Sequence, residues 1–64
     1  MQEYQQRVID EREELYDKLV NLNKFICGTA IFDSLDGDEQ NRLRAQRFIM
    51  NEYADVLTSR IDAF

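Results

Sequence analysis

The chain has 64 residues, with one cysteine, no histidine and no proline, and 8 Lys and Arg against 13 Asp and Glu give a net charge of −5. This composition excludes an internal disulfide, a structural zinc site and any nucleophile or proton shuttle that depends on histidine. The negative charge also argues against DNA as a partner, because duplex DNA is bound through clusters of Lys and Arg.

The first segment predicts an amphipathic helix over about residues 3–27. Its apolar residues recur at spacings of three, four or seven, which places them along one side of a helix. Gly28 follows these residues and is expected to end the helix. The apolar positions are Tyr4, Val8, Leu15, Leu19, Leu22 and Ile26, with Phe25 widening the stripe.

The last segment predicts a second helix over about residues 37–63. Its start is marked by Asp36 and Glu39, which form a variant of the capping box in which the Asp36 carboxylate accepts from free backbone N–H groups. A stripe with a spacing of seven runs along the helix, with further apolar residues on the same side. The stripe is Leu43, Met50, Leu57 and Phe64, and its neighbours are Tyr53, Ala54, Val56 and Ile61.

The connector, about residues 28–36, is not a flexible linker. It contains three apolar residues, Ile31, Phe32 and Leu35, whose exposure to solvent would be unfavourable. We therefore expect a short helical turn that buries them and covers one end of the hairpin. Two long helices joined in this way pack antiparallel. The sequence therefore predicts one all-α domain over residues 1–64, an antiparallel two-helix hairpin with a short helical connector.

Three consecutive residues, Phe48, Ile49 and Met50, extend the apolar surface of the second helix. Together they span about 200° of the helix surface, which one antiparallel partner cannot cover. A core of this size also rarely supplies more than about 3–5 kcal/mol without outside help. We therefore expect a homo-oligomer with these residues at its interface. In the alternative, the connector folds back over Phe48 and Ile49.

Polar residues gather near the free ends of the predicted hairpin. Glu11 interrupts the first apolar stripe, and antiparallel packing brings it towards Arg7 and Arg60. With Tyr53 or Tyr4 beside them, these residues could border a ligand pocket. The alternative is a salt bridge that fixes the register of the two helices, because a carboxylate at a helix seam needs a donor or the solvent edge.

Basic residues gather at the connector end. The residues expected there are Lys24, Arg42, Arg44 and Arg47, of which Arg44 and Arg47 share a helix face and Arg42 points elsewhere. With the backbone amides of residues 28–30 nearby, this end could hold a phosphate. The alternative is a solvated face whose cations pair with the acidic residues of the segment 33–39. That segment does not fit a calcium-binding EF-hand, because its glycine would place a phenylalanine at the first ligand position.

Neither catalysis nor a cofactor is expected. The paired carboxylates Glu13 and Glu14 lie on an exposed helix face, where no pocket would tune their pKa values. Cys27 fits a small buried apolar residue better than a nucleophile. No apolar run approaches the roughly 18 residues of a membrane-spanning helix, and the polar first residues do not resemble a signal peptide. These features predict a soluble intracellular protein that is not an enzyme and binds no metal.

One pattern of residues runs through both predicted helices. In the first half it comprises Gln6, Arg7, Val8, Glu11, Glu14, Leu15, Lys18, Leu19, Leu22, Phe25 and Ile26. In the second half it comprises Phe32, Leu35, Glu39, Gln40, Leu43, Gln46, Met50, Tyr53, Val56, Leu57, Arg60 and Ile61. The pattern is similar to that of a family of small phage and prophage proteins identified by their relation to a protein of a crAss-like bacteriophage. The chain departs from it at Tyr16, where a small or acidic residue is expected.

The resemblance implies a phage-encoded accessory protein that acts in the host cytoplasm. Small oligomeric helical phage proteins often counter host immunity, some by sequestering a cyclic di- or trinucleotide signal. Such a sponge would pair Arg and Lys with phosphates and stack aromatic rings on bases between copies of the chain. The alternatives are an inhibitor or adaptor that binds a host protein through Phe48 and Ile49, and a small structural phage protein.

Overall fold

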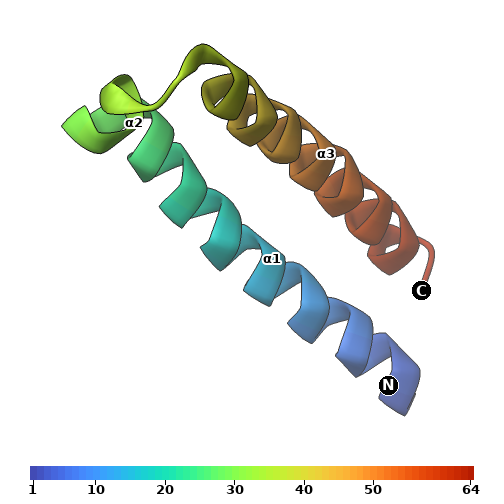
Figure 1. Cartoon of the computed structure of the whole chain (residues 1–64). Coiled ribbons are helices and arrows are strands. Elements are labelled where there is room, and N and C mark those ends of the chain that lie inside the picture. The colour runs from blue at the N-terminus through green and yellow to red at the C-terminus, as the bar shows by residue number, and fades with distance from the viewer.

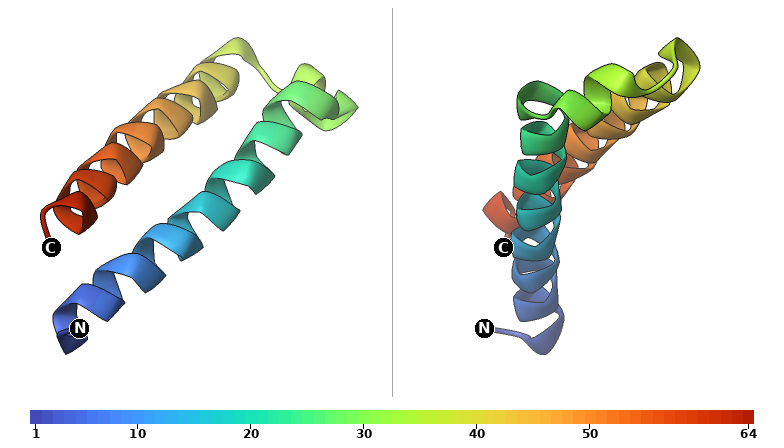
Figure 2. Two further views of the ribbon diagram at one scale, coloured as in Figure 1. Left: turned by 180° about the vertical axis from the view of Figure 1, so that it is seen from behind. Right: turned by 60° about the vertical axis from the view of Figure 1, so that its left-hand side comes forward.

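A computed structural model describes all 64 residues and contains three helices, α1 (Glu3–Gly28), α2 (Ala30–Ser34) and α3 (Gly37–Asp62). The long helices α1 and α3 lie side by side and run in opposite directions, with α2 at the end where they are joined (Figure 1). The two helices are inclined to each other in a molecule of 46 × 15 × 13 Å (Figure 2). The prediction of an all-helical fold with two long packed helices is confirmed.

The junction between α1 and α2 is built on Thr29. Its hydroxyl donates to the carbonyl oxygen of Phe25 at 2.8 Å and accepts from the backbone N–H of Phe32 at 3.2 Å. Thr29 therefore satisfies a free carbonyl at the end of α1 and a free N–H at the start of α2. Gly28 is the last residue of α1, but its φ is not positive, so the helix does not end in the left-handed conformation that favours glycine.

The connector is held against both long helices. Phe32 is buried and meets the ring of Phe25 edge-on, with 6.1 Å between ring centroids. The Gln40 side-chain amide of α3 donates to the carbonyl oxygens of Phe32 at 2.9 Å and Leu35 at 3.2 Å. Ile31 is 62% exposed, so the expectation that it is buried was wrong. A single helical turn presents only one side to its neighbours, and Phe32 takes that side.

Helix α3 begins at the predicted cap. The Asp36 carboxylate accepts from the backbone N–H of Glu39 at 2.8 Å, as expected for an N-cap. Asp38 and Glu39 place negative charge in the first turn, where the helix dipole favours it.

The core is a narrow seam between the two long helices. Leu57 of α3 is fully buried. Met50 and Ile61, also of α3, are partly buried and pack against the core residues of both helices. At the open end the rings of Tyr4 and Phe64 meet edge-on at 6.1 Å, so the two ends of the chain lie together. The buried residues of the seam are Val8, Leu15 and Leu19 from α1 and Ala54 and Leu57 from α3.

Helix α3 also carries apolar residues outside the seam. Phe48 and Ile49 are 65% and 64% exposed, so the connector does not fold back over them. Tyr53 and Val56 were expected on the core side but are exposed. With Ile49 they are spaced four and three residues apart, which makes a second stripe beside the seam. Met50, expected at an oligomer interface, instead packs against the core of its own hairpin.

Candidate functional site

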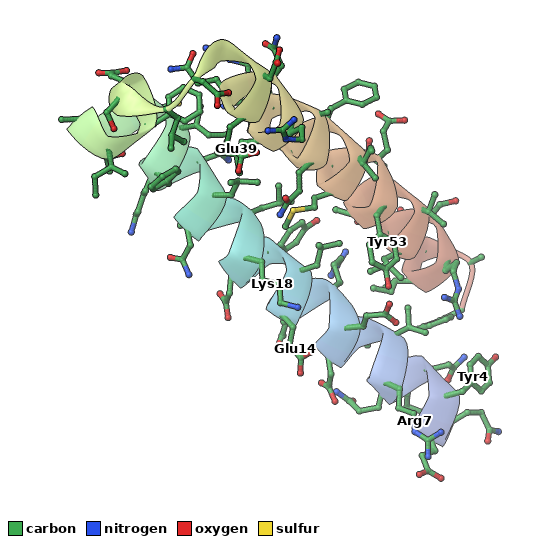
Figure 3. The ribbon with its side chains drawn as sticks, in the orientation of Figure 1. Tyr4, Arg7, Glu14, Lys18, Glu39 and Tyr53 are labelled. Carbon is green, nitrogen blue, oxygen red and sulfur yellow. The ribbon has the colours of Figure 1, made fainter.

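The residues expected near the free ends do not form one connected cluster. Arg7 pairs with Glu3 of its own helix, with 2.7 Å between Nη2 and Oε1, and both side chains are exposed (Figure 3). Glu11 is partly buried and forms no ion pair, and Arg60 is exposed and forms none. The predicted salt bridge that would fix helix register was therefore wrong. Tyr53 lies two turns before Arg60 in α3, away from the free end, and is exposed on the second stripe.

At the connector end the basic residues make separate contacts. Arg47 approaches α1, with its Nη1 3.5 Å from Asn23 Oδ1 and 3.8 Å from Cys27 Sγ. Arg44 lies over the ring of Phe32, with 5.2 Å from its Cζ atom to the ring centroid. Lys24 is exposed. Cys27 is exposed as well, so the expectation of a buried thiol was wrong.

The alternative, pairing with acidic residues of the segment 33–39, is found for one member of the basic group, Arg42. Arg42 Nε donates to Glu39 Oε1 at 2.8 Å, in one of the two ion pairs of the chain. This hydrogen bond and the charge of Glu39 raise the pKa of Arg42 above its already high ordinary value. Arg44 and Arg47 have no carboxylate partner.

A third group, missed in the sequence, crosses the seam between the long helices. Arg12 Nη1 of α1 donates to Thr58 Oγ1 of α3 at 3.2 Å, and the Tyr16 hydroxyl lies 3.3 Å from the same oxygen. The Arg12 Cζ atom lies 5.6 Å from the centroid of the Tyr16 ring. We call these three residues the Arg12 cluster.

The Arg12 cluster contains a polar atom that the chain leaves without a partner. Arg12 Nε is buried and has no hydrogen-bond acceptor, and Arg12 belongs to neither ion pair. A buried donor without an acceptor costs about 1–3 kcal/mol. The sequence did contain a signal for this site. Arg12 stands four residues after Val8 and three before Leu15, which is a position of the apolar stripe itself.

The single hairpin has no enclosed binding site. No pocket is found on it, and no three His, Cys, Asp or Glu side chains are grouped to hold a metal ion. None of the three helices combines the length and the hydrophobicity that crossing a membrane requires.

Comparison with known proteins identifies a family. The family model described as Sequestin matches residues 2–63, nearly the whole chain. No curated protein and no solved structure matches. The relation to a protein of a crAss-like bacteriophage stays a prediction.

Proposed function

This chain belongs to the Sequestin family, and from that premise we propose that it binds and holds a nucleotide signal without converting it. The observation that carries the proposal is the family match over residues 2–63, because the name denotes sequestration and therefore a binding role rather than a catalytic one. The ligand that we propose is a cyclic di- or trinucleotide of a bacterial defence system, and the place of action is the host cytoplasm.

The distribution of cations supports an anionic ligand. Arg44 and Arg47 at the connector end have no carboxylate partner, and Lys24 is exposed in the last turns of α1. Guanidinium groups pair well with phosphate oxygens, and aromatic rings stack on bases. We retain both ends of the hairpin as candidate sites, the second with Arg7, Glu11, Tyr53 and Arg60.

We further propose that the functional form is a homo-oligomer. Phe48 and Ile49 are exposed on α3, and the stripe of Ile49, Tyr53 and Val56 has the spacing of a helix–helix contact. A second copy of the chain would cover this surface, and the apolar area buried between the copies would add to the small stability that the core of one hairpin supplies. Ligand pockets would then form between copies, each of which contributes cations from its own helices.

The second candidate function is inhibition of a host protein, and the exposure of Phe48 and Ile49 favours it. An inhibitor or adaptor would cover these side chains with a partner rather than with a second copy. For such a protein, Phe48→Glu abolishes partner binding, and no nucleotide raises the melting temperature. The sponge gives the opposite result with its ligand.

Native mass spectrometry tests the proposal. The purified protein is measured alone and with a panel of cyclic di- and trinucleotides and cyclised products of ADP-ribose. The expected result is a discrete oligomer that gains whole, unhydrolysed ligand masses. An oligomer that takes up no member of the panel overturns the proposal for these signals.

Paired variants then assign the end that binds. Arg44→Ala with Arg47→Ala removes charge at the connector end, and Arg7→Ala with Arg60→Ala removes it at the free ends. Loss of ligand uptake in one pair, with the oligomer mass unchanged, identifies the site. Unchanged uptake in both pairs overturns both assignments.

A further inference from the structure

We propose that the Arg12 cluster is a ligand subsite, in which Arg12 receives a phosphate and Tyr16 stacks on a planar ring of the same molecule. The inference rests on the proposed function, because it concerns how a nucleotide is held. The cluster lies in the half of the hairpin nearer the free ends, where Arg12 follows Glu11 in α1 and Thr58 precedes Arg60 by two residues in α3, and it adds a contact to those proposed there.

Arg12 carries a charge that no carboxylate of the chain matches. The chain likewise supplies no carboxylate to Arg44, Arg47 or Arg60, but Arg12 also lies at the seam between the helices. Its Nη1 is bonded to Thr58, and its Nε is buried without an acceptor. Buried polar groups in native proteins almost always have a partner, and an unpaired one calls for an explanation such as a bound ion or water. Arg12 as a whole is only partly buried, so a phosphate that contacts the open part of its guanidinium would supply the missing charge.

Tyr16 is held in place by its neighbours but remains accessible to a ligand. Tyr16 is 43% exposed as a residue, and the Arg12 Cζ atom lies 5.6 Å from the centroid of its ring. Its hydroxyl is tied across the seam to Thr58 Oγ1 at 3.3 Å. A ring held by its own helix and by the neighbouring helix loses little freedom when a base stacks on it. Exposed aromatic rings beside cations are a general means of binding nucleotides without reading their sequence.

The surface of α1 next to the Arg12 cluster is apolar. Val20 lies one helical turn beyond Tyr16 on α1 and is exposed, so it extends the apolar surface next to the ring. A guanidinium, an aromatic face and an apolar side chain thus follow one another along one helix. This order matches a ligand with a phosphate at one end and a planar ring at the other.

Isothermal titration calorimetry tests the inference with the panel member that binds the wild-type protein. The variants are Arg12→Met, which keeps an unbranched side chain but removes the guanidinium and its charge, and Tyr16→Leu, which removes the ring. Arg42→Met is the matched control, because it removes one arginine from an exposed ion pair away from the cluster. Circular dichroism and native mass spectrometry verify the fold and the oligomer of each variant.

We expect Arg12→Met to weaken binding roughly 10- to 100-fold, the effect of losing charge-assisted hydrogen bonds. Tyr16→Leu should weaken it at least about fivefold, and Arg42→Met should leave it unchanged. If Arg12→Met fails to fold, Tyr16→Leu decides the question, because its side chain is largely outside the core. Affinity that is unchanged in the folded variants overturns the inference and leaves the proposed function standing. If no panel member binds the wild-type protein, the proposed function fails, and this inference fails with it.

Discussion

Two isoleucines of nearly equal exposure offer a sharp test of self-association. Ile49 on α3 is 64% exposed, and Ile31 on α2 is 62% exposed. We propose the pair Ile49→Glu and Ile31→Glu, which make the same chemical change at two places. Only Ile49 belongs to the stripe that we expect a second copy to cover.

The magnitude follows from the exposed fraction. Full burial of an isoleucine side chain is worth about 1.5–3 kcal/mol, so covering the exposed two-thirds of Ile49 is worth about 1–2 kcal/mol. In a symmetric dimer each copy contributes once, which gives about 2–4 kcal/mol for the two. The dimer dissociation constant of Ile49→Glu should therefore rise roughly 30- to 1,000-fold, and burying the carboxylate adds to this.

Analytical ultracentrifugation over a range of protein concentrations measures the effect. Ile49→Glu should sediment as a lighter species at concentrations where Ile31→Glu sediments with the wild-type mass. Equal behaviour of the two variants would refute the reasoning. If neither dissociates, the stripe is not the interface. If both do, the effect is not specific to α3.

Three further predictions concern the stability of the hairpin, each measured by urea denaturation at one fixed protein concentration. Leu57→Ala should lower the unfolding free energy by about 2–5 kcal/mol, because it opens a cavity at the fully buried position of the seam, and a loss below 1 kcal/mol would contradict this core. Gly28→Ala should raise it by about 0.4–1 kcal/mol, since a Cβ there meets nothing within 4 Å and φ is not positive; a decrease would show that the helix end is constrained. Asp36→Ala should lower it by about 0.5–2 kcal/mol through loss of the α3 cap, and an unchanged midpoint would mean that the cap adds nothing.

The sequence predicts the helices well because their signals are local. Apolar spacing identified the two long elements, and the cap at Asp36 needed only Glu39 three residues later. The end of α1 was harder to predict from the sequence. Gly28 was expected to end the helix by itself, but Thr29 satisfies the backbone groups on both sides of the junction, a role that depends on the position of α2.

The rotation of each helix about its own axis could not be predicted in the same way. Apolar spacing defines a broad face, but packing against one partner buries only the middle of that face. Ala54 and Leu57 therefore lie inside the seam, whereas Val56, next to Leu57, is exposed. Ile31 is exposed beside the buried Phe32 for the same reason.

The polar contacts required knowledge of which residues face one another across the seam. Its place in the apolar stripe suggested Glu11 as the partner of Arg7 and Arg60, yet Arg7 pairs with Glu3, which is equally close in sequence on the other side. The Arg12 cluster joins residues far apart in sequence, and only the register between α1 and α3 brings Thr58 to Arg12. A basic residue in an apolar stripe is the one signal that could have indicated it.

The edge-on contact of Tyr4 with Phe64 joins the first turn of the chain to its last residue. At the other end the contacts of Thr29 and Phe32 link residues close in sequence. Closing a long loop costs more entropy than closing a short one. Contacts between α1 and α3 should therefore form first near the connector, and the helices should separate first at the termini. Backbone amides should then show a gradient of hydrogen exchange, slow near the connector and fast towards the ends. A ligand that bridges the two helices at the Arg12 cluster would slow exchange most between the cluster and the termini, and the exchange gradient would then reveal where along the hairpin it binds.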